Sequence, residues 1–169
     1  MEKWDAYDCC GHRTGEILVR GAPIPKDRYH LVCEVLVRHV DGSVLCMLRD
    51  RSKTNYSGWY EATAGGSALL GETPMDCARR ELLEETGIDR GEFTLLNRIV
   101  SERQQSIFYV YLCTVEWDKS KVTLQQGETE DWLWMEDTSF GEFVRSDRMI
   151  PNQKVRFHDY FVSCGYLNE

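Results

Sequence analysis

The sequence predicts an α/β fold in which helices cover both faces of a mixed sheet. The run 30–38 is almost continuously apolar and β-branched, as a strand buried on both faces would be. Segments with strand character stand before, between and after the predicted helices, which is typical of a layered α/β domain. The segment 73–87 combines helix-start and helix-stop signals around one amphipathic stretch. These observations predict an α/β/α sandwich.

Length and charge limit the class of protein. The chain of 169 residues predicts one domain, 1–169, in which 1–28 form an N-terminal strand extension. The net charge of -8 argues against a nucleic-acid or membrane surface, because phosphate backbones and anionic lipids attract basic patches. Without a long apolar run or a signal-peptide pattern, we expect a cytoplasmic protein. Seven cysteines without CxxC spacing favour neither a disulfide framework nor a zinc site.

The remaining elements follow from hydrophobic periodicity and from turn residues. We expect strands near Trp4, at 16–20, 30–38, 44–48, 58–64, 93–101 and 106–115, and a short one after 126–135. We expect helices at 73–86, 140–144 and 152–164, the last with Val155 and Cys164 among its inward-facing residues.

The helix that starts at Thr73 carries the most informative pattern. Thr73 is a good N-cap, Pro74 suits the first helical position, and Gly87 can take the left-handed conformation that ends helices. Three carboxylates lie within an arc of about 100° and repel one another at spacings of three and four residues: Glu81, Glu84 and Glu85. A solvated acidic face would explain an isolated segment of this kind. A hard divalent cation bound through oxygen would relieve the repulsion.

A longer pattern surrounds these glutamates. Its order is Gly66, five residues, Glu72, seven residues, Arg80-Glu81-Leu82, one residue, Glu84-Glu85, one residue, Gly87-Ile88. This order matches the Nudix box at every specified position, and the chain therefore resembles the Nudix hydrolase family, with 66–88 as the box. Nine specified positions at fixed spacing make chance agreement improbable. The resemblance implies the Nudix-type α/β/α sandwich with a mixed sheet.

The resemblance also implies a role for individual residues in and beside the box. Glu84 and Glu85 would bind the metal, Mg²⁺ or Mn²⁺, and Glu85 is a predicted catalytic residue. Glu81 would be a further ligand or the catalytic group that orients or deprotonates water, and the carbonyl of Gly65 is another ligand candidate. Four residues of the box would give structural support: Gly66, Glu72, Arg80 and Gly87. At the two glycines, the expected backbone conformation is one that a side chain would resist.

Two regions outside the box supply further candidates. Arg49 and Arg51 follow a predicted strand and would grip substrate phosphate, unless they are only solubilising surface charge. Nudix hydrolases commonly draw another glutamate from a loop in the region 126–135. The spacing does not decide between Glu128 and Glu130, and a solvated acidic loop is the simpler alternative. Glu130 is the one that we include among the predicted catalytic residues.

The N-terminal region, through Tyr29-His30-Leu31, resembles the family branch nearest to isopentenyl-diphosphate isomerases. Histidines in this region of the isomerases bind a metal, so His12 and His30 are either ligands or hydrogen-bonded structural residues. The isomerases carry a cysteine-histidine motif on the strand before the box. This chain has the sequence EATAGG at 61–66 instead. The isomerase reaction would therefore lack its acid.

These features predict hydrolysis of a phosphoanhydride bond in a nucleoside-diphosphate-linked compound or a related diphosphate. The alternative is a Nudix domain that senses a nucleotide or metabolite without cleaving it, and the missing motif disfavours a third possibility, isomerase-like activity. The expected partner is a small-molecule diphosphate, with no nucleic acid or membrane, and a homodimer is a candidate assembly. Specificity should lie in the loops 49–58 and 101–106 and in the N-terminal strands.

Overall fold

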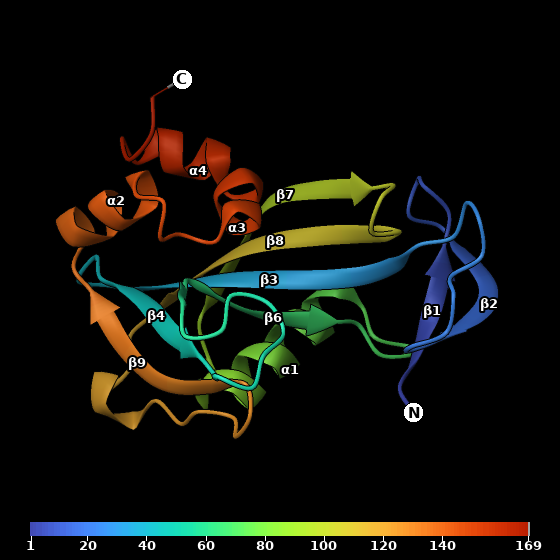
Figure 1. Cartoon of the computed structure of the whole chain (residues 1–169), viewed down its shortest axis with the longest axis horizontal. Coiled ribbons are helices and arrows are strands. Elements are labelled where there is room, and N and C mark those ends of the chain that lie inside the picture. The colour runs from blue at the N-terminus through green and yellow to red at the C-terminus, as the bar shows by residue number, and fades with distance from the viewer. Residues whose placement is uncertain (169) are drawn as a thin grey trace.

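The computed structural model describes residues 1–168, which form two sheets flanked by helices. A two-stranded sheet, β1 (Lys3–Tyr7) and β2 (Arg13–Val19), lies at one end of the molecule. Figure 1 shows α1 (Pro74–Thr86) below the large mixed sheet and α2 (Asp137–Arg145), α3 (Pro151–Arg156) and α4 (His158–Ser163) above it. The predicted α/β/α sandwich is confirmed. Within residues 1–168, no helix has the length and apolar character needed to cross a membrane.

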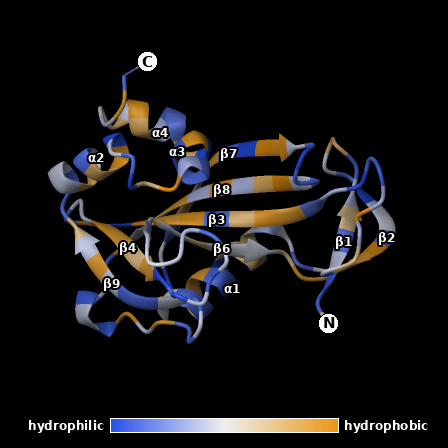
Figure 2. Cartoon of the chain, in the orientation of Figure 1, coloured by the Kyte–Doolittle hydropathy of each residue, from blue (hydrophilic) through white to orange (hydrophobic). Residues whose placement is uncertain are grey.

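The large sheet is built around β3 (His30–His39), which pairs in parallel with β8 over its whole length. The other pairings in the sheet are antiparallel, and they involve β4 (Val44–Arg49), β5 (Tyr60–Glu61), β6 (Thr63–Ser67), β7 (Glu92–Ser101), β8 (Ser106–Val115) and β9 (Thr129–Met135). Cys33, Val35 and Val37 join the core on the α1 side, and Leu36 joins the core under α2–α4. The apolar run in β3, largely orange in Figure 2, therefore faces two cores.

β3 and β4 separate directly after the hairpin that joins them. Arg38 opposite Val44 is their single paired position, and beyond it β6 pairs with β3 while β5 pairs with β4. The prediction of one strand over 58–64 is therefore wrong. The chain changes partner at Ala62, because it crosses from β4 to β3 there. This crossing brings the end of β6 over α1, where the functional candidates lie.

The box helix α1 begins and ends where its local signals predict. The Thr73 hydroxyl accepts from the Asp76 amide at 3.2 Å, and the Asp76 carboxylate accepts from the Thr73 amide at 3.0 Å. Pro74 is the first helical residue, and Gly87 takes φ 73°. Each of these features satisfies or removes an unpaired backbone group at a helix end. The helix boundaries are consequently set by neighbouring residues rather than by distant contacts.

The helix predicted over 152–164 is two helices. Phe157 separates α3 from α4, with φ -99° and ψ 11°, and its side chain is fully buried. The break changes which side of α3 faces the sheet, so Val155, predicted to pack inward, is exposed. The inward residue is Gln153.

Gln153 supports the crossing between β5 and β6. Its Oε1 accepts from the Ala62 amide at 3.1 Å, and its Nε2 donates to Oγ1 of Thr63 at 2.7 Å. A buried amide at a strand break needs such a partner, because the sheet ladder no longer supplies one. Gln153 therefore docks α3 at the one place where the large sheet changes its pairing.

We predict that Gly65→Ala destabilises the protein more than Gly66→Ala. A Cβ at Gly65 would lie less than 3.0 Å from the carbonyl oxygen of Cys33, which is backbone in the neighbouring strand. Gly65→Ala should lower the free energy of unfolding by about 2–3 kcal/mol. A Cβ at Gly66 would meet only the flexible Glu81 carboxylate, and its cost should be about 1 kcal/mol or less. Urea unfolding would measure both, and equal losses would contradict the backbone argument.

Candidate active site

Two of the three box glutamates are buried where α1 meets β6. Glu81 and Glu85 expose 9% and 7% of their surface, whereas the side chain of Glu84 exposes 45%. The Gly65 amide donates to Oε2 of Glu85 at 3.3 Å, which joins the helix to the strand. The acidic face of α1 is therefore not a uniformly solvated surface.

Burial desolvates these two carboxylates, and nearby positive charge offsets only part of their negative charge. Burial raises the pKa of Glu81, although Arg80 opposes the change. Burial raises the pKa of Glu85 well above its ordinary value, and the carboxylates of Glu61, Glu81 and Glu128 raise it further. Desolvation and like charges both disfavour ionisation, so the cluster favours either a bound proton or a bound cation.

Arg80 connects the box turn to the helix. Its Nε and Nη2 donate to the two oxygens of Glu72 at 2.7 and 3.0 Å, and Nη2 also donates to the Ser67 carbonyl at 3.1 Å. Its Nη1 donates to Glu81 at 2.7 Å and to Glu84 at 3.1 Å. A bidentate arginine-carboxylate pair is both strong and geometrically specific. Arg80 thus holds the turn and offsets part of the charge on α1.

The two box glycines meet different requirements. Gly87 has φ 73°, a left-handed conformation that a side chain resists. Gly66 does not have a positive φ, so the prediction that it supplies an unusual backbone conformation is wrong. It provides space instead, because a Cβ there would lie less than 3.0 Å from the carboxylate of Glu81.

Two adjoining cavities open over the carboxylates. The first, the box cavity, has a volume of about 370 Å³ and is lined by α1, β6 and Lys53. The second, the α3 cavity, has a volume of about 270 Å³ and lies between β3, the β5–β6 crossing and α3. Gly65, Glu85 and Glu128 line both. Glu85 is thus placed where one extended ligand could occupy both cavities.

Glu61 is a functional candidate that sequence reasoning missed. It is buried on β5, lines the α3 cavity and accepts from Nη1 of Arg49 at 2.7 Å. Burial raises its pKa, with the nearby charge of Arg49 opposing the change. The sequence feature that could have identified Glu61 is a carboxylate within the strand that is expected to lead into the box. Arg49, a predicted phosphate-binding residue, therefore lies in a cavity wall but is already paired.

The structure separates the two glutamates near β9. Glu128 lines both cavities and forms an ion pair with Lys53. Glu130, the predicted catalytic residue, lines neither; it accepts from the Arg51 amide at 2.9 Å and lies 3.5 Å from the guanidinium. A register shift in the β4–β9 ladder falls at Glu130, and such a bulge redirects side chains. Of these two glutamates, Glu128 is the one that borders the cavities. Arg51, 83% exposed, also lies outside both cavities.

The α3 cavity contains a buried ion pair that the sequence did not indicate. Glu34 on β3 pairs with Arg156 on α3, and the Arg156 guanidinium lies 3.5 Å above the centre of the Phe108 ring. Burial raises the pKa of Glu34 to about 7 against the opposing charge of Arg156. Residues far apart in the chain form this pair, so local spacing carries no signal for it.

The histidines considered as metal ligands lie away from the two cavities. His30 is buried, its ring centroid is 4.3 Å from that of Trp4, and burial lowers its pKa. His12 lies in an exposed turn, where its Nδ1 is 3.2 Å from Oδ2 of Asp8. Neither ring borders the Glu85 cluster.

Comparisons with known proteins agree with this architecture. The NUDIX domain family model matches residues 28–153. An uncharacterized Nudix hydrolase of Listeria monocytogenes is 27% identical over 151 residues, covering 89% of each chain. The crystal structure of DR0079 from Deinococcus radiodurans has a TM-score of 0.72 at 18% identity, covering 96% of this chain and 99% of that one. The NUDIX domain of Shewanella oneidensis NrtR, complexed with ADP ribose, has a TM-score of 0.59 at 14% identity, with coverage of 88% and 91%.

The class of domain is defined by an α/β/α sandwich in which buried carboxylates of α1 lie beside Gly65 and Gly66 of β6. The chain belongs to the Nudix family, whose members generally hydrolyse nucleoside diphosphate derivatives, and it is a pyrophosphohydrolase.

We predict that Glu85 makes the metal-free protein less stable as the pH rises. The folded state holds a proton on Glu85 above the ordinary glutamate pKa, whereas the unfolded state has released it, so the free energy of unfolding falls through that range. Glu85→Gln should therefore raise the melting temperature relative to wild type more at pH 8 than at pH 6.

Thermal unfolding in EDTA would measure this difference. His30, whose pKa is lowered, contributes with the opposite sign but is common to both proteins. Glu84→Gln is the matched control on the same helix, because Glu84 is largely solvated. Parallel curves for wild type and Glu85→Gln would contradict the assignment.

Proposed function

We propose that the protein hydrolyses a phosphoanhydride bond in a nucleoside-diphosphate-linked small molecule, or in a related diphosphate, with Mg²⁺ or Mn²⁺. The observation that carries this proposal is the carboxylate cluster between two adjoining cavities, formed by the buried Glu61, Glu81 and Glu85 and the partly exposed Glu128. Members of this family generally use divalent metals.

The donor set fits a hard divalent cation. Carboxylate and carbonyl oxygens are the ligands that Mg²⁺ prefers. The nearby cations Arg49, Lys53 and Arg80 each already pair with a carboxylate, and the pKa of Glu85 is nevertheless raised. The residues that would hold the metal are Glu81, Glu84, Glu85 and the carbonyl of Gly65, with Glu61 or Glu128 added. A bound metal would polarise phosphate oxygens and lower the pKa of a coordinated water.

The protein's own side chains would perform the other functions. Glu61 and Glu128 flank Glu85, and either could accept the proton of the attacking water. A carboxylate with a raised pKa is better matched to proton transfer near neutral pH, which favours Glu61. Lys53 and Arg156 line the cavities and would offset charge on the phosphates.

The two alternative functions, metabolite sensing and isomerase-like chemistry, would require different side chains at this site. A domain that only sensed a metabolite would have no use for so many poorly compensated carboxylates. Isomerase-like chemistry would need an acid, and neither cysteine nor histidine lines the two cavities within residues 1–168. The homodimer and the cytoplasmic location stay predictions.

We predict that Glu85→Gln and Glu81→Gln each lower turnover at least about 100-fold. The amide keeps the shape of the side chain but removes the charge needed at the metal. Phosphate release would be measured on nucleotide sugars, dinucleotides, ADP-ribose and dNTPs with Mg²⁺ or Mn²⁺, after thermal unfolding has shown that both variants fold. Retained activity in either variant would refute its role. Measurable binding without release across the whole panel would favour the sensor.

We also predict that Glu128 and Glu130 differ in their importance. Glu128→Gln should lower kcat by about 100-fold, because Glu128 lines both cavities with Glu85 and is a candidate ligand of the metal. Glu130→Gln should change kcat by less than about threefold, because it loses only a contact with exposed Arg51. The same phosphate-release assay applies, and a reversed order of the two effects would restore Glu130 as the catalytic candidate.

A further inference from the structure

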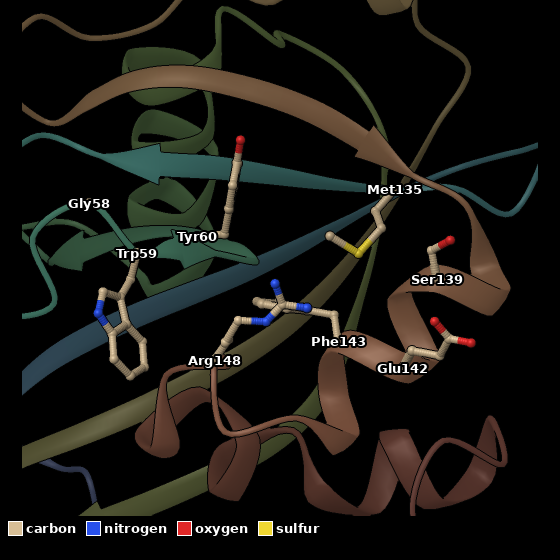
Figure 3. Close-up of a pocket in the computed structure, with 8 residues that line it drawn as sticks. All are labelled: Gly58, Trp59, Tyr60, Met135, Ser139, Glu142, Phe143 and Arg148. Atoms are coloured by element: carbon tan, nitrogen blue, oxygen red, sulfur yellow. The ribbon is translucent and has the colours of Figure 1, made fainter.

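A third cavity is larger than either part of the proposed active site. This Trp59 pocket has a volume of about 530 Å³ and lies between the segment 58–60 and α2. Figure 3 shows its apolar wall, formed by Trp59, Tyr60, Met135 and Phe143. Small-molecule sites typically have volumes of about 300–1,000 Å³ and mostly apolar walls with a few polar groups. The pocket has the size of a ligand site, and its lining combines apolar side chains with polar groups.

Two opposite charges supply the polar groups of the Trp59 pocket. Glu142 and Arg148 both line it, and within residues 1–168 neither side chain forms an ion pair or a hydrogen bond. In Figure 3 the guanidinium of Arg148 lies between Trp59 and Glu142. Arginine only donates hydrogen bonds and an ionised glutamate only accepts them. A ligand that satisfies both must offer acceptors and donors beside a flat apolar surface.

An aromatic pair connects the Trp59 pocket to the α3 cavity. Tyr56 lines the α3 cavity, and its ring centroid is 5.3 Å from that of Trp59. The two side chains are 37% and 38% exposed, respectively, although both are large and apolar. Tyr56 has φ 53°, a conformation uncommon for a residue with a side chain, and its carbonyl accepts from the Trp59 amide at 3.1 Å. The loop therefore presents two positioned, partly solvated rings.

A second segment of the chain also contributes to both cavities. Arg148 lines the Trp59 pocket, and Ile150, two residues later, lines the α3 cavity. The α3 cavity in turn shares Glu85 and Glu128 with the box cavity. The α3 cavity therefore lies next in the chain to the Trp59 pocket at two segments and shares the carboxylates Glu85 and Glu128 with the box cavity.

We propose that the Trp59 pocket binds the nucleobase of the substrate, with the base stacked on Trp59. Arg148 donates to an exocyclic carbonyl oxygen or a ring nitrogen, and Glu142 accepts from a ring N–H or an exocyclic amine. A nucleobase combines a stacking face with both kinds of hydrogen-bonding group, which an alkyl chain or a sugar alone does not. The position of the diphosphate rests on the proposed hydrolysis, whereas base binding needs no metal.

The first test measures binding without metal. Isothermal titration calorimetry in EDTA would compare AMP, GMP, CMP and UMP with ribose 5-phosphate, which keeps the sugar and phosphate but lacks the base. We expect at least one nucleoside monophosphate to bind at least about tenfold more tightly than ribose 5-phosphate, the size of effect that base stacking produces. Equal affinities for all five compounds would overturn the proposal.

Variants then locate the bound base. Trp59→Leu should weaken the preferred nucleoside monophosphate about tenfold, and Trp59→Phe, which keeps a ring, should weaken it less than about threefold. Arg148→Met should weaken it by about the same factor as Trp59→Leu. Leu95→Ser is the control, because Leu95 is exposed on β7 at the other edge of the sheet. Wild-type affinity in both Trp59→Leu and Arg148→Met would overturn the proposal.

A second readout separates this inference from the proposed function. In Trp59→Leu, the ratio of kcat/KM for a nucleoside diphosphate to kcat/KM for methyl diphosphate should fall about tenfold. An unchanged ratio with active enzyme would overturn the base site and leave the hydrolase intact. Base binding that depends on Trp59, without hydrolysis of any compound, would support the base site and refute the proposed reaction.

Discussion

The close approach of the β6 backbone to the box helix is the constraint on which the rest of the structure depends. Gly65 lies against the backbone of β3, and Gly66 leaves room for the carboxylate of Glu81. A side chain at Gly65 would push β6 from β3, and one at Gly66 would displace the carboxylate of Glu81. The approach excludes water from Glu81 and Glu85, and desolvated carboxylates interact far more strongly with a cation than solvated ones do. The geometry of two glycines thereby sets the electrostatics of the whole site.

The change of pairing at Ala62 is the second requirement. It places Glu61 on a strand paired with β4 and Gly65 on a strand paired with β3, so that both border the same cavity. The unpaired amide at this point needs a partner, and α3 provides one through Gln153. α3 also carries Arg156 and closes the α3 cavity. One interruption in a sheet therefore explains the position of an entire helix.

Sequence reasoning succeeded where structure is local. The caps of α1, the buried strand β3 and the arc of glutamates all follow from residues within one or two helical turns or within one strand. It failed where distant segments meet. The bulge that separates Glu128 from Glu130 depends on pairing with β4, and the ion pair between Glu34 and Arg156 joins the first third of the chain to its end. Neither has a signature in nearby residues.

The residues of the box and many of the residues that line the Trp59 pocket and the α3 cavity come from different stretches of chain. Residues 65–85 supply the two glycines of β6, Arg80 and the box carboxylates, whereas 55–61 and 148–156 supply half of the residues that line the Trp59 pocket and the α3 cavity, Glu61 among them. Substitutions in the outer stretches leave the contacts of Arg80 and of the two glycines untouched. Substitutions at the outer walls, Glu61 apart, can therefore alter which ligand fits without disturbing the geometry of the box.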